Sequence, residues 1–191
     1  MNARAMLACP TPARWLESAL ANLDEVLHDH AHCEKKAAST VLSFVFRVPD
    51  PELAGAFSRM AREELTHFEM TLRELRRRGI PFGRLAPSGY AGRLTAACRK
   101  RPEPDALCDA FVAAALIEAR SCERLALLRD AVDDPALRTF YAALEPAEER
   151  HHRLLLHAAG RFGDAAARLG VLRDVEAALV REGEALPRMH S

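Results

Sequence analysis

The sequence contains no apolar run approaching the roughly 18 residues of a membrane-spanning helix, which excludes a transmembrane protein. Its first residues lack the apolar core of a secretory signal peptide. The five cysteines are odd in number and include no Cys-x-x-Cys pair, which argues against a disulfide framework and against a thiolate zinc site. These absences predict a cytoplasmic protein with no membrane partner.

Alternating apolar and polar residues, typical of a half-buried strand, are also missing, and apolar residues instead recur at helical spacing. The first stripe runs from Leu16 to Val45, with Thr11 as the expected N-cap and Pro12 at the first helical position. Three further stripes start after Pro51, near Asp105 and after Asp134. They predict an all-α protein.

Residues 80–104 form a long connection that is rich in glycine and proline, with a short helix expected around 93–99. Two helix pairs with short turns, joined by such a connection, indicate a four-helix bundle with a crossover between helices 2 and 3. We therefore expect one domain over residues 1–191, with a core bundle at about 12–160 and an additional C-terminal helix at about 164–183.

Ionisable side chains fill gaps in all four apolar stripes. A buried carboxylate without a partner is very costly, so these residues need an explanation. The residues placed on the core face in this way are Glu34, Glu64, His67, Glu118, Glu148 and His151.

The spacing of the four carboxylates is regular. Glu34 and Glu64 are 30 residues apart, as are Glu118 and Glu148, and each pair is centred on a predicted turn. In an antiparallel hairpin, residues equidistant from the turn lie at the same height, here about 22 Å above it at 1.5 Å per residue. The spacing thus predicts two carboxylate pairs at matching levels.

Glu-x-x-His occurs four times, whereas chance predicts roughly 0.7 occurrences in this composition. The pair Glu25/His28 falls on the opposite face of its helix, and Glu149/His152 lies one step off its stripe. The other two begin at Glu64 and Glu148, on the core stripes. Surface ion pairs are the alternative interpretation, and the phase of the stripes argues against it.

Four carboxylates and two neutral imidazoles carry four negative charges, which two divalent cations neutralise. Oxygen-rich ligation with some imidazole suits iron or manganese better than zinc. One Glu from each of two helices and Glu-x-x-His from the other two is the pattern of ferritin-like dimetal carboxylate bundles. In that class Glu64 and Glu148 would bridge the metals, with Glu34 and Glu118 as terminal ligands. His30, one turn from Glu34, is expected to support that ligand rather than bind metal.

Four segments point to one family within this class of dimetal bundles. They are HAHCEKKAA (30–38), REELTHFE (62–69), IEARSCER (117–124) and EERH (148–151). They resemble the MiaE family, tRNA hydroxylases that act on 2-methylthio-isopentenyl-adenosine beside the anticodon. The resemblance implies a non-haem di-iron monooxygenase that hydroxylates the isopentenyl group. It implies iron rather than manganese, dioxygen as co-substrate, and an electron-donor protein.

Charge is unevenly distributed although its formal sum is zero: residues 73–101 hold nine Lys or Arg and one acid. With a tRNA substrate, this segment becomes a candidate phosphate-binding surface. The candidate contacts are Arg76, Arg77, Arg78, Arg99, Lys100 and Arg101.

Two other functions remain open at this point. A ferritin-like iron-oxidising or peroxide-scavenging enzyme would use the same six ligands without a nucleic-acid substrate. A metal-free helical RNA-binding or scaffold protein would need its carboxylates exposed. The sequence does not determine the oligomeric state, and it places Pro146 inside the fourth helix, where proline usually kinks the chain.

Overall fold

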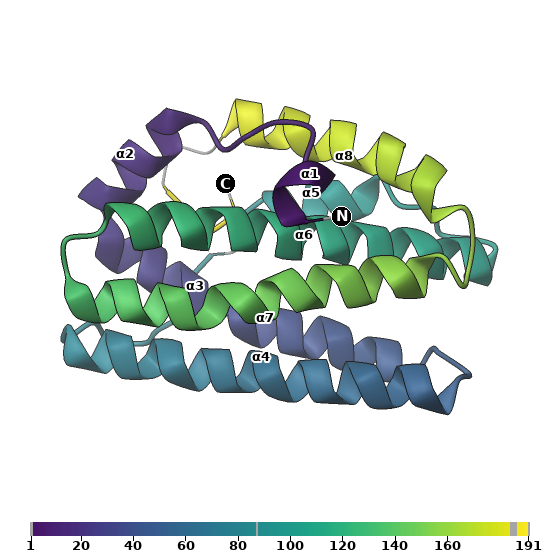
Figure 1. Ribbon diagram of the computed structural model, residues 1–191, viewed down its shortest axis with the longest axis horizontal. Helices are drawn as coiled ribbons and strands as arrows, with labels where there is room; N and C mark the ends of the chain where they lie inside the picture. The colour runs from purple at the N-terminus through teal and green to yellow at the C-terminus, as the bar shows by residue number, and fades with distance from the viewer. Residues whose placement is uncertain (1, 87, 184–186, 191) are drawn as a thin grey trace. The chain divides into compact units, whose positions relative to one another are not determined.

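The computed structural model describes residues 2–86, 88–183 and 187–190, and the regular elements in these ranges are all α-helices (Figure 1). The all-α prediction is therefore confirmed. The chain divides into two compact units, unit 1 (Met1–Ala21 and Pro87–Ser191) and unit 2 (Asn22–Ala86). The prediction of a single domain stays a prediction.

Unit 2 is an antiparallel pair of long helices, α3 (Leu23–Val45) and α4 (Pro51–Arg77). Asp50 caps α4 by accepting a hydrogen bond from the Glu52 amide at 3.0 Å, next to a proline at the first helical position. Gly79, at φ 72°, follows the end of α4 in the left-handed conformation expected of a C′ glycine.

Unit 1 is built on α6 (Glu103–Ala131) and α7 (Pro135–Ala159), a second antiparallel pair. Asp134 caps α7 by accepting a hydrogen bond from the Ala136 amide at 2.9 Å. The C-terminal helix α8 (Ala165–Glu182) packs on α6, and so do the short helices α1 (Ala3–Met6), α2 (Ala13–Ala21) and α5 (Tyr90–Ala96) (Figure 1).

The apolar stripes explain why these helices pair. In unit 2, Val41 on α3 and Phe57 and Met60 on α4 are buried. In unit 1, neighbours pack on several sides of α6, so buried residues surround most of that helix. Burial of an apolar face against a partner supplies most of the stability of helices of this length.

The first predicted helix is wrong in one respect, because it is interrupted at Asn22. The backbone of Asn22 leaves the helical region (φ −134°, ψ 43°), which separates α2 from α3. Thr11 is not the N-cap, because α2 begins at Ala13 and Pro12 directly precedes it; the Thr11 hydroxyl instead donates to Glu123 Oε2 at 2.6 Å. The connection contains a helix at 90–96, slightly earlier than expected.

Within the described residues, none of the helices has the length and apolar character needed to cross a bilayer.

Candidate metal centre

Unit 2 brings Glu34 on α3 together with Glu64 and His67 on α4. The three side chains are buried, and each offers one donor atom within 4.8 Å of the others. His67 Nδ1 lies 3.6 Å from Glu34 Oε2 and 3.7 Å from Glu64 Oε2. The two carboxylates thus lie at one level of the hairpin, as their equal distance from the turn predicts.

His30 lies one turn before Glu34 on the same face of α3. Its Nε2 atom is 2.6 Å from Glu34 Oε1, and both side chains are buried. This contact occupies one oxygen of the carboxylate and limits its rotation. The arrangement is that of a residue that orients Glu34.

Unit 1 contains a second trio of the same composition. Glu118 on α6 and Glu148 and His151 on α7 are buried, with donor atoms within 4.8 Å of one another. Pro146 does not interrupt α7, which continues through it to Ala159. The Arg150 side chain donates a hydrogen bond to the Pro146 carbonyl at 3.0 Å.

The donor chemistry of each trio suits a metal ion. Ligands about 2.1 Å from one cation lie roughly 3–4.2 Å apart, so side chains with donors this close need little movement to share one. Two carboxylates and an imidazole match a hard or borderline divalent cation. The Glu-x-x-His that begins at Glu25 is different, because Glu25 is exposed. Each buried trio could therefore hold a metal ion.

Thiolate ligation is disfavoured beside both trios. Burial, followed by the charge of Asp29, raises the pKa of Cys33 well above its ordinary value. Burial, followed by the charge of Glu149, raises the pKa of Cys122 to about 12. Both thiols therefore stay protonated at neutral pH.

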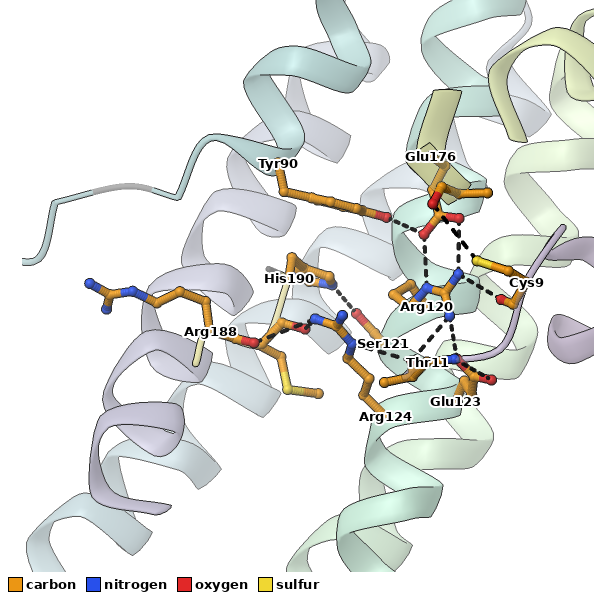
Figure 2. Close-up of polar contacts among 12 residues, drawn as sticks. Cys9, Thr11, Tyr90, Arg120, Ser121, Glu123, Arg124, Glu176, Arg188 and His190 are labelled. Atoms are coloured by element: carbon orange, nitrogen blue, oxygen red, sulfur yellow. Dashed lines mark hydrogen bonds and ion pairs between the residues drawn. The ribbon is translucent and has the colours of Figure 1, made fainter. Parts of the chain in front are cut away.

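The sequence did not predict a group of buried charges on α6, in the helix that carries Glu118. Arg120 is fully buried, and its guanidinium donates to Glu176 on α8 at 2.8 and 2.9 Å and to Glu123 (Figure 2). Tyr90 donates to Glu176 as well, at 2.9 Å. A guanidinium buried with two carboxylates is a strong, directional tie between α6 and α8.

A second buried arginine, Arg124, holds residues near the end of the chain. It donates to the Met189 carbonyl at 2.7 Å, and its guanidinium carbon lies 4.3 Å from the Trp15 ring centroid. Burial, followed by the charge of Arg120, lowers the pKa of Arg124 to about 10. Ser121 and His190 are hydrogen-bonded at 2.8 Å, as Figure 2 shows. Helical spacing did not predict these buried ion pairs and hydrogen bonds, because arginines and glutamates ordinarily lie on the solvent-exposed face of a helix.

The predicted tRNA contacts differ in their surroundings. Arg76 and Arg101 are exposed. Arg77 pairs with Glu74 at 2.8 Å, and Arg78 pairs with Asp24 at 2.7 Å. These pairs lie on the surface of unit 2, where water and ions compete with them.

The other two predicted contacts lie in unit 1. Lys100 is exposed and donates to the Thr95 carbonyl at 3.0 Å. Arg99 donates to the buried Asp109 through its amide at 2.8 Å and its Nη2 at 2.7 Å, and it also pairs with Asp105. Arg99 therefore has a clear structural role, whatever it contributes to binding.

Comparison with known proteins then identifies the family. The family model described as tRNA-(ms2io6A)-hydroxylase, MiaE, matches residues 1–191. The chain belongs to the MiaE family. A tRNA 2-(methylsulfanyl)-N6-isopentenyladenosine(37) hydroxylase from Pseudomonas putida is 42% identical, with 98% of this chain and 92% of the relative covered. A hydroxylase of the same name from Salmonella typhimurium is 31% identical, with 97% and 87% covered.

A solved structure also resembles this member of the MiaE family. It is titled as protein 43 with aldehyde deformylating oxygenase activity, from Synechococcus. The TM-score is 0.91 at 41% identity, with 97% of this chain and 96% of that chain covered. The likeness confirms the ferritin-like helical bundle predicted from the sequence.

Proposed function

We propose that this chain is a di-iron, dioxygen-dependent monooxygenase that hydroxylates the isopentenyl group of 2-(methylsulfanyl)-N6-isopentenyladenosine in tRNA. The observation that carries the proposal is the pair of matched buried trios, each with two carboxylates and one imidazole, in a chain of the MiaE family. The proposed substrate is the one in the names of the two relatives.

The two trios would serve as halves of one centre. In this proposal Glu34, Glu64, Glu118 and Glu148 would hold two iron ions. The imidazoles of the two Glu-x-x-His motifs complete the set. Two divalent cations balance the four buried carboxylates, which removes the cost of isolated charges in the interior.

When bound, the iron pair would supply the reduction of dioxygen and the oxidising power to attack an unactivated C–H bond. The overall reaction consumes one dioxygen, two electrons and two protons, and it yields one C–OH group and one water. The two electrons come from an electron-donor protein in this proposal.

The protein's own residues position that chemistry. His30 holds one oxygen of Glu34 at 2.6 Å. The tie from Arg120 to Glu176 fixes α6 against α8 and so steadies the helix that carries Glu118. Because the substrate base is stacked in the anticodon loop, it has to leave the stack to reach a buried centre.

Nucleoside mass spectrometry of tRNA tests the proposal. A strain lacking the gene should lose the hydroxylated nucleoside and accumulate its 2-(methylsulfanyl)-N6-isopentenyl precursor. The wild-type gene should restore it, and a Glu64→Ala variant should not. Glu25→Ala, which alters an exposed glutamate of the same motif, is the matched control and should restore it. An unchanged nucleoside profile in the deletion strain would reject the function.

Aldehyde oxidation is a second candidate, favoured by the likeness to the Synechococcus protein. Iron-loaded protein given a reductant, dioxygen and a medium-chain aldehyde should then release the aldehyde carbon as formate and the rest of the chain as the alkane one carbon shorter. Counted with formic acid as the product, this reaction consumes four electrons and four protons per dioxygen and also yields one water. If formate appears and the tRNA profile is unchanged, this candidate replaces the first. Peroxide consumption without either product indicates the scavenging alternative.

A further inference from the structure

An aromatic cluster lies on the surface of unit 2, apart from the residues discussed so far. Phe82, in the segment after α4, is 42% exposed. Its ring stacks on His32 of α3, with centroids 4.8 Å apart and an angle of 27°. His28 and Phe68 meet the same ring edge-on, at 6.0 and 5.6 Å. Phe82 is thus an exposed ring with defined neighbours.

Backbone contacts fix the segment that carries this ring. His32 Nε2 donates to the Gly83 carbonyl at 2.9 Å, and the Gly83 amide donates to His28 Nε2 at 3.3 Å. Both histidines lie on the face of α3 next to the segment. The ring is therefore held on a preformed platform, which lowers the entropy lost when a flat ligand stacks on it.

Positive charge surrounds the platform. Lys35 Nζ lies 5.2 Å from the Phe82 ring centroid, and Lys36 and Arg84 are exposed nearby in the sequence. Residues 73–86, which lead into and beyond Phe82, contain five arginines and a single acid, Glu74. An exposed aromatic ring flanked by cations is the combination that binds single-stranded nucleic acid, since rings stack on bases and cations meet phosphates.

The helical repeat separates this platform from the metal-ligand trio of the same unit. His28, His32 and Lys35 follow one face of α3, whereas Glu34 is roughly 100–160° around the helix axis from each of them. A base on Phe82 would therefore be a neighbour of the nucleotide that reaches the buried centre, and not that nucleotide itself.

We propose that Phe82, with His28, His32 and Lys35, forms a stacking site for an unpaired nucleotide of the anticodon loop, next to the modified base. The inference rests on the proposed tRNA substrate, which it extends by naming where the loop is held. RNA is the partner that the charge and the exposed ring favour.

Direct binding measurements separate stacking from packing. With a labelled anticodon stem-loop RNA, Phe82→Leu should weaken binding by about 5- to 100-fold, because the apolar volume stays and the flat ring is lost. Phe82→Trp should keep binding within about threefold, and its indole emission should be quenched by RNA. Lys35→Gln should weaken binding. It should also reduce the slope of log affinity against log salt concentration by about the amount expected for one phosphate contact.

Phe46→Leu is the matched control. Phe46 is 84% exposed on the same unit, next to the turn that follows α3, and it should leave RNA affinity unchanged. Thermal melting and iron content of every variant show whether a loss of affinity reflects misfolding. Wild-type affinity in Phe82→Leu, or unquenched emission in Phe82→Trp, overturns the site.

The hydroxylase function and the Phe82 stacking site can be rejected independently of each other. If wild-type protein hydroxylates tRNA while Phe82→Leu binds RNA normally, the stacking site is wrong and the function stands. If Phe82→Leu loses RNA affinity while the deletion strain keeps its nucleoside profile, the site stands and the hydroxylase function is wrong. If the wild-type protein fails to bind the stem-loop at low salt, the stacking site is rejected.

Discussion

His30 Nε2 lies 2.6 Å from Glu34 Oε1, one helical turn away on α3, and both side chains are buried. The contact restrains a carboxylate that also lies 3.6 Å from His67. Residues that orient a metal ligand change affinity without changing the number of ions bound. This distinction separates a supporting residue from a seventh ligand.

We therefore predict that His30→Gln weakens iron binding by about 10- to 100-fold while the number of ions bound at saturation stays the same. Competition titration against a chelator of known affinity gives both quantities. A reduced number of ions at saturating iron would show that His30 is itself a ligand.

Loss of a carboxylate from a buried trio should lower iron binding strongly and affect the stability of the metal-free fold little. Glu64→Gln is predicted to lower the iron content at saturation, because a neutral amide is a poor ligand for a ferrous or ferric ion. The metal-free variant should unfold at the same temperature as metal-free wild type or above it, since removing a buried charge relieves its desolvation cost.

Iron analysis and calorimetry of the metal-free and loaded proteins check this prediction. Glu25→Gln is the control, because Glu25 belongs to an exposed copy of the same motif and should change neither quantity. Full iron content in Glu64→Gln would contradict the assignment of Glu64 as a ligand.

Asp109 should make the stability of unit 1 sensitive to acid. Burial alone would raise the pKa of Asp109, but hydrogen bonds from Arg99 and Arg168 outweigh it and lower that pKa below the ordinary value of 3.8. A lowered native pKa contributes stability above the unfolded value, and that contribution disappears as pH falls through the native value. Asp109→Asn should cost about 1–3 kcal/mol of unfolding free energy at neutral pH.

Urea denaturation at several pH values tests this linkage. The difference in unfolding free energy between wild type and Asp109→Asn should be constant near neutral pH and should decrease below about pH 3.8. Asp130→Asn is a useful comparison, because its pair with Arg129 is on the surface and should contribute little. A gap that persists at low pH would contradict the role given to the Asp109 carboxylate.

The exposed cations should contribute to RNA binding and not to stability or iron binding. Reversing Arg76 and Arg101 to glutamate is predicted to weaken tRNA binding at low salt and to leave melting temperature and iron content unchanged. Arg99→Glu, in contrast, should lower the melting temperature, because it removes hydrogen bonds to the buried Asp109. Unchanged tRNA affinity of the double variant at low salt would reject these two contacts.

Patterned features of the sequence were predictable. Apolar stripes indicated the long helices, and the 30-residue spacing placed Glu34 level with Glu64 and Glu118 level with Glu148. The phase of the stripes correctly separated exposed Glu25 from the buried trios. These features follow from helical geometry, which depends only on position along the chain.

Features that depend on contacts between distant residues were not predictable. Asn22 breaks the first stripe without a proline or glycine to mark it. Charged residues ordinarily lie on the solvent-exposed face of a helix, which predicts that Arg120 and Glu176 are exposed. In the structure both side chains are buried and form an ion pair, although they are 56 residues apart in the sequence. The ion pair of Arg99 was not predictable, because its partner Asp109 lies outside the basic segment.

Each helix pair carries two carboxylates and one imidazole in the same order and at the same interval. A symmetric dimer of one such pair would already present a complete set of six donors. The two helix pairs are therefore an internal repeat, the pattern that duplication and fusion of a two-helix peptide would leave behind.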